Sequence, residues 1–401
     1  MTAVTQLNAD DGLTKDLLLN LGPQHPSTHG VLRILLEMEG ERIVKADPII
    51  GYLHRAFEKM AEAGTYTQTI PLTDRLDYLC QASNNLGFVR AVENLLGIKA
   101  PERAQYIRVL MAELSRISGH LLITGALPMD LGAMTALLYT MREREMVMDL
   151  MEMVSGSRMM SSYCRVGGVR EDLPDGFTDR TAEFCQIFGK RISDYEQLLS
   201  NNRMFAKRTK GIGVISTEDA IDWGLSGPCL RASGVDWDIR RDKPYEIYDR
   251  LDFDVIVSHN GDCYDRWWCR MEEMKQSLKM IVQCLEQMPE GRFQIDAPEI
   301  AFPSDKTEVK KSMEALIHQF KLAAHGIEVP KGEWYEAIEA PKGELGYYII
   351  SDGSAIPFRV KVRAPSFVNL QAMQPMCKDC YLADLIAIVG SLDPVMAEVD
   401  K

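Results

Sequence analysis

Residues 121–141 read LLITGALPMDLGAMTALLYTM, and the way in which this stretch folds decides the architecture of the chain. It is as long and apolar as a membrane span, and it contains one charged residue, Asp130. Pro128 and Gly132 flank that carboxylate, and a helix breaker beside a charge is unfavourable inside lipid. We therefore predict two helices that meet at a break within a protein core, and no transmembrane helix in this chain.

Asp130 also directly precedes LGAMTALL, so an N-cap, which contributes about 1 kcal/mol, explains it as well as a functional role does. Methionines crowd the same region, with nine of the 22 between Met129 and Met160. Flexible thioethers suit an adaptable or ligand-binding surface, although a methionine-rich helix is more often part of a core. Both interpretations fit the sequence.

Helical periodicity extends outward from this stretch over about 52–208. Pro101 followed by Glu102 predicts the start of a long helix. Its apolar face consists of residues three and four apart, namely Ile107, Leu110, Leu114, Ile117 and Leu121. Several such helices predict a bundle, followed by a mixed segment and another helix near 264–287.

Both ends of the chain have the alternating, branched pattern of strands. In the N-terminal part the predicted strands are 17–20, 31–38 and 42–47. In the C-terminal part they are 333–341, 346–351 and 357–365, before a final helix near 382–389. The predicted fold class is therefore α+β, because long helices and separate antiparallel strands share one chain.

Three parts follow from this pattern. They are a small N-terminal antiparallel sheet with its loop (1–65), a central helical bundle with a mixed insertion (66–330), and a C-terminal strand-rich segment with a final helix (331–401). No repeat or low-complexity linker separates them, so we expect them to pack as one unit.

The loop 22–30, GPQHPSTHG, joins the first two predicted strands and carries two of the seven histidines. Pro26 restricts His25 to extended geometry, while Gly22 and Gly30 permit bends, so the loop should be stiff. Histidine changes charge near neutral pH, which makes this loop a reasonable place for chemistry. Hydrogen bonding within the turn explains the two imidazoles equally well.

Composition excludes several function classes. The 401 residues carry a net charge of −13, which disfavours nucleic acid as a partner because phosphate binding needs a basic surface. Neither a P-loop nor a dinucleotide-binding glycine pattern occurs, so NAD is not expected to bind this chain directly. Nine scattered cysteines and a polar N-terminus without a signal-peptide pattern predict a reducing, cytoplasmic setting.

Metal-ligand spacing is also weak. Cys377 and Cys380 supply half of a four-thiolate site, and no second pair accompanies them. His25 and His29 would share a face only on a helix, which Pro26 opposes. We therefore expect no metal site and no iron–sulfur cluster held by this chain alone.

A set of segments in a fixed order nevertheless resembles the quinone-site subunit of respiratory complex I, the 49 kDa-type subunit of NADH-quinone oxidoreductases. The segments are NLGPQHPSTHGVLR, GYLHRAFEK, TDRLDYL, LPMDLGA, RVGGVREDLPDGF, WGLSGPCLRASGVDWDIR, GDCYDRWWCRMEEM, EAPKGELGYYIISDGS and GSLDPVMAEVDK. They cover nearly the whole chain. That family is itself similar to the large subunit of nickel–iron hydrogenases, which implies a hydrogenase large-subunit-like fold.

Hydrogenase chemistry is disfavoured by the residues at the metal-binding positions. Hydrogenases hold their metal through R-x-C-x-x-C and D-P-C-x-x-C, whereas residues 75–80 read RLDYLC and residues 393–398 read DPVMAE here. Cys80 alone cannot complete a nickel–iron site, because such metals need several thiolates. Stoichiometric nickel in the purified protein would restore this alternative.

What the resemblance implies instead is a quinone site. His29 and Tyr78 match the ligands of the quinone headgroup, and Asp130 matches the carboxylate that pairs with the histidine. Two donors suit this substrate, because each quinone oxygen gains negative charge and a proton on reduction to quinol. Ubiquinone or menaquinone would be the substrate, and His25 would brace the loop.

The resemblance also implies partners and a location. Arg55 and Arg75 match arginines near a terminal [4Fe–4S] cluster in a neighbouring subunit. An adjoining peripheral-arm subunit and a membrane subunit at the quinone entrance would complete the surroundings. The chain would lie on the cytoplasmic side of a bacterial inner membrane, as part of a proton-translocating NADH:quinone oxidoreductase. One departure is Met160, because many members carry histidine two residues after Arg158.

Two alternatives share the fold. One is a ferredoxin-fed, plastoquinone-reducing relative, whose electron-input module lies on other subunits. The other is a scaffold without catalysis, against which the complete set of His29, Tyr78 and Asp130 argues.

Overall fold

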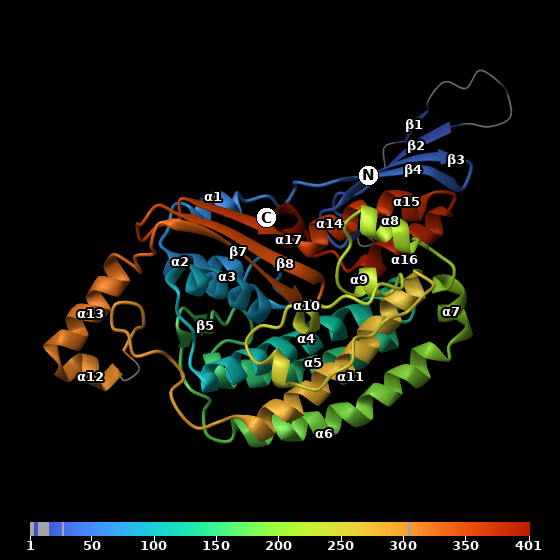
Figure 1. Cartoon of the computed structure of the whole chain (residues 1–401). Helices are drawn as coiled ribbons and strands as arrows, with labels where there is room; N and C mark the ends of the chain where they lie inside the picture. The colour runs from blue at the N-terminus through green and yellow to red at the C-terminus, as the bar shows by residue number, and fades with distance from the viewer. Residues whose placement is uncertain (1–3, 7–15, 26–27, 304–305) are drawn as a thin grey trace.

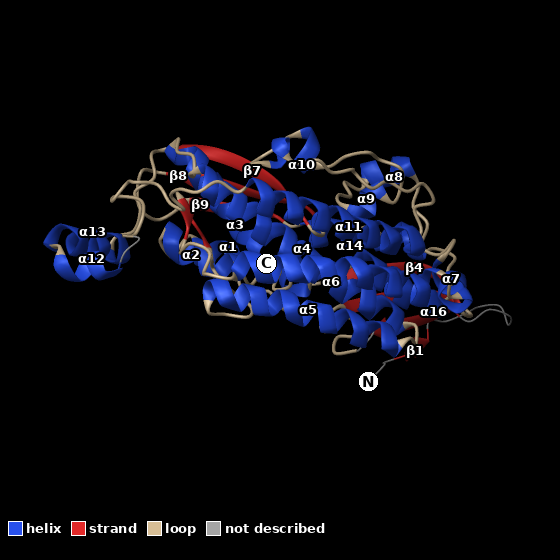
Figure 2. Ribbon diagram, turned by 90° about the horizontal axis from the view of Figure 1, so that it is seen from below, coloured by secondary structure: helices blue, strands red, loops and turns tan. Residues whose placement is uncertain are grey.

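The long helices form a bundle that lies against a three-stranded sheet (Figure 1). The computed structural model describes residues 4–6, 16–25, 28–303 and 306–401. The long helices are α3 (Gln81–Leu96), α4 (Glu102–Asp130), α5 (Met134–Ser155), α6 (Phe177–Tyr195) and α11 (Cys263–Gln287). Helices α4, α5, α6 and α11 run side by side, as the view from below shows (Figure 2). The predicted α+β class is confirmed.

In the described part of the chain, three antiparallel sheets accompany the helices. The first contains β1 (Val4–Gln6), β2 (Asp16–Leu21), β3 (Arg33–Glu39) and β4 (Arg42–Ile49) in chain order. The second is the short pair β5 (Cys164–Arg165) and β6 (Gly168–Val169), and the third contains β7 (Gly332–Ala340), β8 (Gly343–Ser351) and β9 (Arg359–Arg363). Each of the six predicted strands overlaps a strand of the first or third sheet.

Shorter helices fill the connections. Before the C-terminal sheet they are α1 (Phe57–Ala61), α2 (Tyr66–Thr73), a π-helical turn (Glu196–Ser200), α7 (Arg203–Thr209), α8 (Thr217–Asp222), α9 (Pro228–Arg231), α10 (Ile239–Asp242), a 3₁₀ turn (Tyr248–Arg250), α12 (Lys306–Lys311) and α13 (Met313–Ala324). After it come α14 (Pro365–Gln371), α15 (Met373–Cys377), α16 (Leu382–Leu392) and α17 (Met396–Asp400). The periodicity predicted α16 but missed α14, α15 and α17.

The stretch 121–141 forms two helices, as predicted, and the break lies at Gly132 and not at Pro128. Helix α4 continues through Pro128 and ends at Asp130, and Gly132 takes a positive φ of 97° before α5 begins. Pro128 cannot donate to the carbonyl of Thr124, and the indole N–H of Trp267 approaches that oxygen at 3.5 Å instead. A compensating donor therefore lets the helix pass the proline.

The predicted N-cap at Asp130 is wrong. Ala133 occupies the N-cap position of α5 and makes no side-chain capping bond, whereas Asp130 is the last residue of α4. Gly132 lies between Asp130 and Ala133, and its left-handed backbone turns the chain between the two helices. Within the described ranges, no helix is long and apolar enough to cross a membrane.

Two hydrophobic cores form among the residues that the structure describes. The larger lies between the long helices and the third sheet, and it contains the whole predicted apolar face of α4, whose five residues are fully buried. The smaller joins the first sheet to α16, for example through Leu36 and Leu385. Both cores draw on residues from distant parts of the sequence, while the division at 1–65, 66–330 and 331–401 stays a prediction.

Helices α4 and α5 approach each other closely at Gly125. A Cβ there would lie 2.8 Å from the Cα of Leu137 and would also meet the hydroxyl of Thr140. Backbone cannot yield as a flexible side chain can, so Gly125→Ala should lower the free energy of unfolding by about 1–3 kcal/mol. Thermal unfolding followed by circular dichroism measures the change.

Gly189 in α6 provides the matched control, because a Cβ there would meet Leu278 at an ordinary 3.4 Å. Gly189→Ala should gain up to about 1 kcal/mol from helix propensity. Equal midpoints for the two variants would contradict the close approach at Gly125.

Candidate functional site

His29 and Asp130 lie close together at the C-terminal end of α4. His29 lies in the loop between β2 and β3 with a positive φ of 49°, and Asp130 ends α4. Their Nε2 and Oδ2 atoms are 3.8 Å apart, and the side chains are 20% and 14% exposed. Helix α16 passes beside them at Gly390, where an added Cβ would lie 3.9 Å from His29 Nε2 and 3.8 Å from Asp130 Oδ2. Three segments distant in sequence converge here.

The electrostatics of this pair favour a positive charge beside the carboxylate. Burial raises the pKa of Asp130, and the imidazole of His29 lowers it in part. The negative end of the α4 dipole lies at the same point. The Nε2 atom of His29 is buried without a hydrogen-bond partner among the described residues, because 3.8 Å is too long for a hydrogen bond. This nitrogen can therefore serve a further polar group.

His25, assigned a bracing role, forms an isolated antiparallel bridge with Gly30. Its carbonyl also accepts hydrogen bonds from the backbone and the hydroxyl of Thr28. Pro26, the residue expected to restrict it, lies outside the described residues.

Tyr78 lies in the turn between α2 and α3 and is 36% exposed. Burial of its inner side raises the phenol pKa, Asp77 and Asp393 raise it further, and Lys342 opposes them. No hydrogen bond or ion pair in the described structure joins Tyr78 to His29. The predicted site residues thus form one close pair and a third group on a separate segment.

A buried ion cluster lies directly behind Tyr78. Lys342, in the turn between β7 and β8, places its Nζ atom 2.9 Å from Asp77 Oδ2 and 3.6 Å from Asp393 Oδ2. The lysine is 1% exposed, and the two aspartates are 2% and 5% exposed. A lysine so deeply buried is stable only with such partners.

Glu398 and Cys80 complete this cluster. Burial and the charge of Asp77 raise the pKa of Glu398 to about 7, against the opposing charge of Lys342. Its Oε2 atom accepts hydrogen bonds from the hydroxyl of Ser366 and, at 3.3 Å, from that residue's backbone N–H. Burial raises the pKa of the Cys80 thiol, so it stays protonated. The two ends of DPVMAE thus lie near Asp77 and Cys80 of RLDYLC.

Sequence reasoning missed Lys342. The available signal was three acidic residues, Asp77, Asp393 and Glu398, in the two segments that bind metal in hydrogenases. Buried carboxylates need a cation, and once thiolates and metal are lost, a side chain must supply it. Among the described residues, no group of three or more His, Cys, Asp or Glu side chains is arranged to hold a metal ion.

Helix α16 connects the two parts of the site. Gly390 borders His29 and Asp130, and Asp393 ends the same helix three residues later in a left-handed conformation with φ of 54°. Residues at the C-terminal end of α16 therefore border both parts of the site.

Arg55 and Arg75 lie together at the end of α2. Their guanidinium groups donate to the carbonyls of Leu72 and Pro71, where the helix dipole favours cations. Burial and the neighbouring Arg75 lower the pKa of Arg55. Both arginines are exposed, and neither has a carboxylate partner in the described ion pairs. They form a small positive surface close to the Tyr78 turn.

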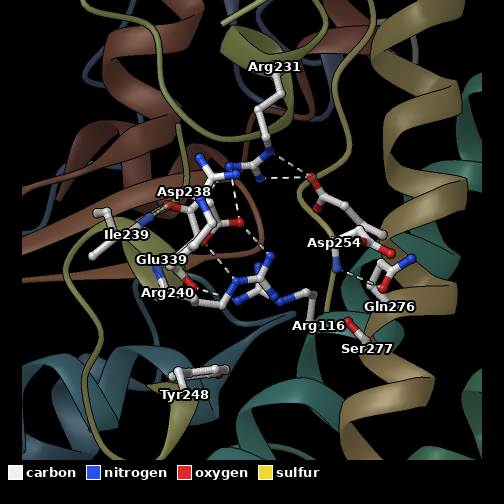
Figure 3. Close-up of polar contacts among 12 residues, drawn as sticks. Arg116, Arg231, Asp238, Ile239, Arg240, Tyr248, Asp254, Gln276, Ser277 and Glu339 are labelled. Carbon is white, nitrogen blue, oxygen red and sulfur yellow. Dashed lines mark hydrogen bonds and ion pairs between the residues drawn. The ribbon is translucent and has the colours of Figure 1, made fainter. Parts of the chain in front are cut away.

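A second polar network has a structural role. Arg231 pairs with Glu273 at 2.8 Å and with Glu339 at 2.7 Å, while Arg240 pairs with Asp238 at 2.7 Å (Figure 3). These buried groups come from α9, α10, α11 and β7, and opposite charges satisfy one another. The network joins the third sheet to the bundle, and both Arg231 and Arg240 have carboxylate partners.

Known proteins similar to this chain belong to one family. The family model for "Respiratory-chain NADH dehydrogenase, 49 Kd subunit" matches residues 130–401. The second D-type subunit of the NADH-quinone oxidoreductase of Rhizobium meliloti (strain 1021) is 70% identical over the full length of both chains. The D-type subunit of the NADH-quinone oxidoreductase of Geotalea uraniireducens (strain Rf4) is 54% identical, over 97% of this chain and 99% of its own.

The fold and these similarities define an α+β subunit of an oxidoreductase complex. The chain belongs to the family of the 49 kDa subunit of respiratory-chain NADH dehydrogenase. The predicted family is therefore confirmed, and other subunits of that complex are its partners.

Lys342→Met tests the ion cluster. The substitution keeps the length of the side chain but leaves Asp77 and Asp393 buried without their cation, which should cost about 3–5 kcal/mol of unfolding free energy. The loss should be smaller at pH 5 than at pH 8, because protonation relieves an unpaired buried carboxylate. Denaturant unfolding at the two pH values measures it.

Lys45→Met is the control, because Lys45 pairs with Asp47 at the surface with its side chain 55% exposed. This variant should unfold almost like the unmodified protein at both pH values. A Lys342→Met protein with the same behaviour would show that the cluster contributes little.

Proposed function

We propose that this chain forms the quinone-binding pocket of an NADH-quinone oxidoreductase, together with an adjacent iron–sulfur subunit. The observation that carries the proposal is the buried Nε2 atom of His29, which has no hydrogen-bond partner among the described residues. Leaving such an atom unsatisfied costs about 1–3 kcal/mol, and a quinone oxygen would supply the missing partner. The relatives' names, which specify quinone as the acceptor, support this substrate.

In this proposal quinone accepts two electrons and two protons to become quinol. His29 gives a proton to one oxygen and Tyr78 gives a proton to the other. Each side chain gives up its proton more easily as the quinone oxygen that it faces gains negative charge. Asp130, whose Oδ2 atom lies 3.8 Å from His29 Nε2, holds the imidazole in place.

Loss of the proton from His29 would leave Asp130 as an unpaired carboxylate at the negative end of α4. Such a site is unfavourable for a partly buried charge, so the pair would be driven to rearrange. We propose this change as the electrostatic trigger for proton translocation elsewhere in the complex. Helix α16, which borders both residues at Gly390, would transmit the movement.

Electrons would arrive from the [4Fe–4S] cluster of the adjacent subunit. The exposed pair Arg55 and Arg75 would face that cluster, because unpaired guanidinium groups favour a reduced, more negative centre. An adjoining peripheral-arm subunit and a membrane subunit at the quinone entrance would complete the pocket. The chain would then lie peripherally on the cytoplasmic side of a bacterial inner membrane. NADH as the donor, rather than ferredoxin, is supported by the relatives' names.

Substitution of the two donors tests the proposal. His29→Ala and Tyr78→Phe should each lower NADH-driven quinone reduction by at least about 100-fold in the assembled complex, because each removes one acid. Oxidation of NADH by membranes with added short-chain quinone measures the rate, and native gels measure assembly.

His325→Ala and Tyr348→Phe are controls, since His325 lies in the turn after α13 and Tyr348 bonds to Glu333 at the surface of β8. Both should keep the full rate. Normal rates in assembled His29→Ala and Tyr78→Phe complexes would favour the scaffold alternative instead.

Met160 provides a separate test. Many members of the family that this chain resembles carry a histidine at the position of Met160. An imidazole there could couple reduction of the cluster to proton uptake. Met160 has a positive φ of 58°. It lies close in sequence to Arg158, which pairs with Glu145 and Asp149. We expect a cluster potential that depends weakly on pH, and a steeper dependence in Met160→His, as measured by redox titration. A steep slope in the unmodified complex would contradict this expectation.

A further inference from the structure

Glu398 is a buried carboxyl group, and the charges of Asp77 and Lys342 act both on it and on Tyr78. It is 1% exposed, and its helix α17 packs against α14, which supplies both of its hydrogen bonds through Ser366. The titratable groups that act on it or feel its charge are Asp77, Lys342, Tyr347 and Lys401. Asp77 adjoins Tyr78 in sequence, so the acid and the phenol border the same ion cluster.

Charge within this cluster does not balance if every group is ionised. Asp77, Asp393 and Glu398 would contribute three negative charges against the single ammonium of Lys342, and all four residues are buried. Lys342 forms ion pairs with both aspartates. Even so, the Oδ2 atom of Asp393 has no hydrogen-bond partner in the described structure. Lys342 therefore forms ion pairs with two of the three carboxyl groups, and its charge acts on Glu398 only at longer range.

Glu398 is the member that can be neutral at least cost. It has no ion pair with Lys342, and its close contacts are the hydroxyl and the backbone N–H of Ser366. A carboxylic acid accepts from such donors through one oxygen and retains its own proton on the other. One proton therefore resides on Glu398 at rest.

We propose that Glu398 stores a proton for the quinone site and delivers it to Tyr78 after that phenol has protonated the quinone. This inference rests on the proposed function, since it assigns the source from which Tyr78 is recharged. Glu398 acts through Tyr78 and is a positioning and proton-storing residue, not a group that touches the substrate.

The proton balance is simple. The O–H bond of Tyr78 breaks as a new O–H bond forms on the quinone oxygen, whose electrons come from the reduced iron–sulfur cluster of the partner subunit. The O–H bond of Glu398 then breaks and that of Tyr78 forms again, with Asp77 or water as the carrier between them. Glu398 remains as a carboxylate facing Lys342 until the solvent returns a proton.

The direction of this transfer follows from the two acids. Burial and Asp77 raise the phenol pKa of Tyr78 above its usual value near 10, whereas the pKa of Glu398 is about 7. A tyrosinate is therefore the stronger base, and the proton moves toward it spontaneously. Lys342 stabilises the carboxylate that is left.

The test is a pH profile of NADH-driven quinone reduction in the assembled complex, with a short-chain ubiquinone as acceptor. The unmodified complex should slow as the pH rises through about 7, because the store empties. Glu398→Gln should be about tenfold slower at pH 6 and should lose this step. Glu398→Asp keeps a carboxyl group and should restore both rate and step in part.

Glu339→Gln is the matched control, because Glu339 is equally buried but belongs to the network of Arg231. It should keep the step near neutral pH. An assembled Glu398→Gln complex with the original rate and profile would overturn the inference. If Glu398→Gln fails to assemble, an unchanged step in Glu398→Ala or an absent one in Glu398→Asp would overturn it as well.

The two proposals fail in different ways. Inactive His29→Ala and Tyr78→Phe complexes with an unaltered Glu398→Gln profile would refute the proton store alone. Active His29→Ala and Tyr78→Phe complexes would refute the quinone site and the store together.

Discussion

The ammonium of Lys342 between Asp77 and Asp393 is the interaction on which the site depends. It joins the turn between β7 and β8 to the turn that carries Tyr78 and to the end of α16. Removal of the cation would leave carboxylates buried without a partner, which is far more costly than the loss of a surface ion pair. The cluster therefore holds a fixed set of charges behind the phenol of Tyr78.

Three residues earlier in the chain, beside Gly390 of α16, the arrangement is weaker. His29 and Asp130 approach to 3.8 Å without a hydrogen bond, and the backbone of His29 has a positive φ. The ion pair of Lys342 and Asp77 behind Tyr78 is close, whereas the pair of His29 and Asp130 at Gly390 is loose. The loose pair can rearrange more easily than the close one. We regard the loose pair as the part of the site that responds to a ligand, because its missing bond can be made by one.

Much of the fold could be predicted from periodicity alone. The start of α4 at Glu102, the buried face from Ile107 to Leu121 and the strands at both ends follow from local patterns. Local patterns failed at Asp130, because whether a helix stops at a proline depends on a donor elsewhere, here the indole of Trp267. The short helices α14, α15 and α17 have too few turns for a clear period.

The predicted site divides in the same way. His29 and Asp130 are brought together, and so are Arg55 and Arg75, whereas Tyr78 has no direct contact with the histidine among the described residues. Residue types at matched positions indicate which groups matter, but they carry no distances. Lys342 was invisible to this reasoning because no pattern near it announces a partner 265 residues away.

The amino-acid sequence alone was enough to establish the family, the helical and strand segments, and the loss of thiolates that rules against a nickel–iron centre. The three-dimensional arrangement was needed to show that a lysine supplies the cation among Asp77, Asp393 and Glu398, and that Asp130 ends one helix instead of starting the next. The physical reason is that periodicity reflects burial within one element. Charge pairing in a dry interior instead depends on which elements pack together.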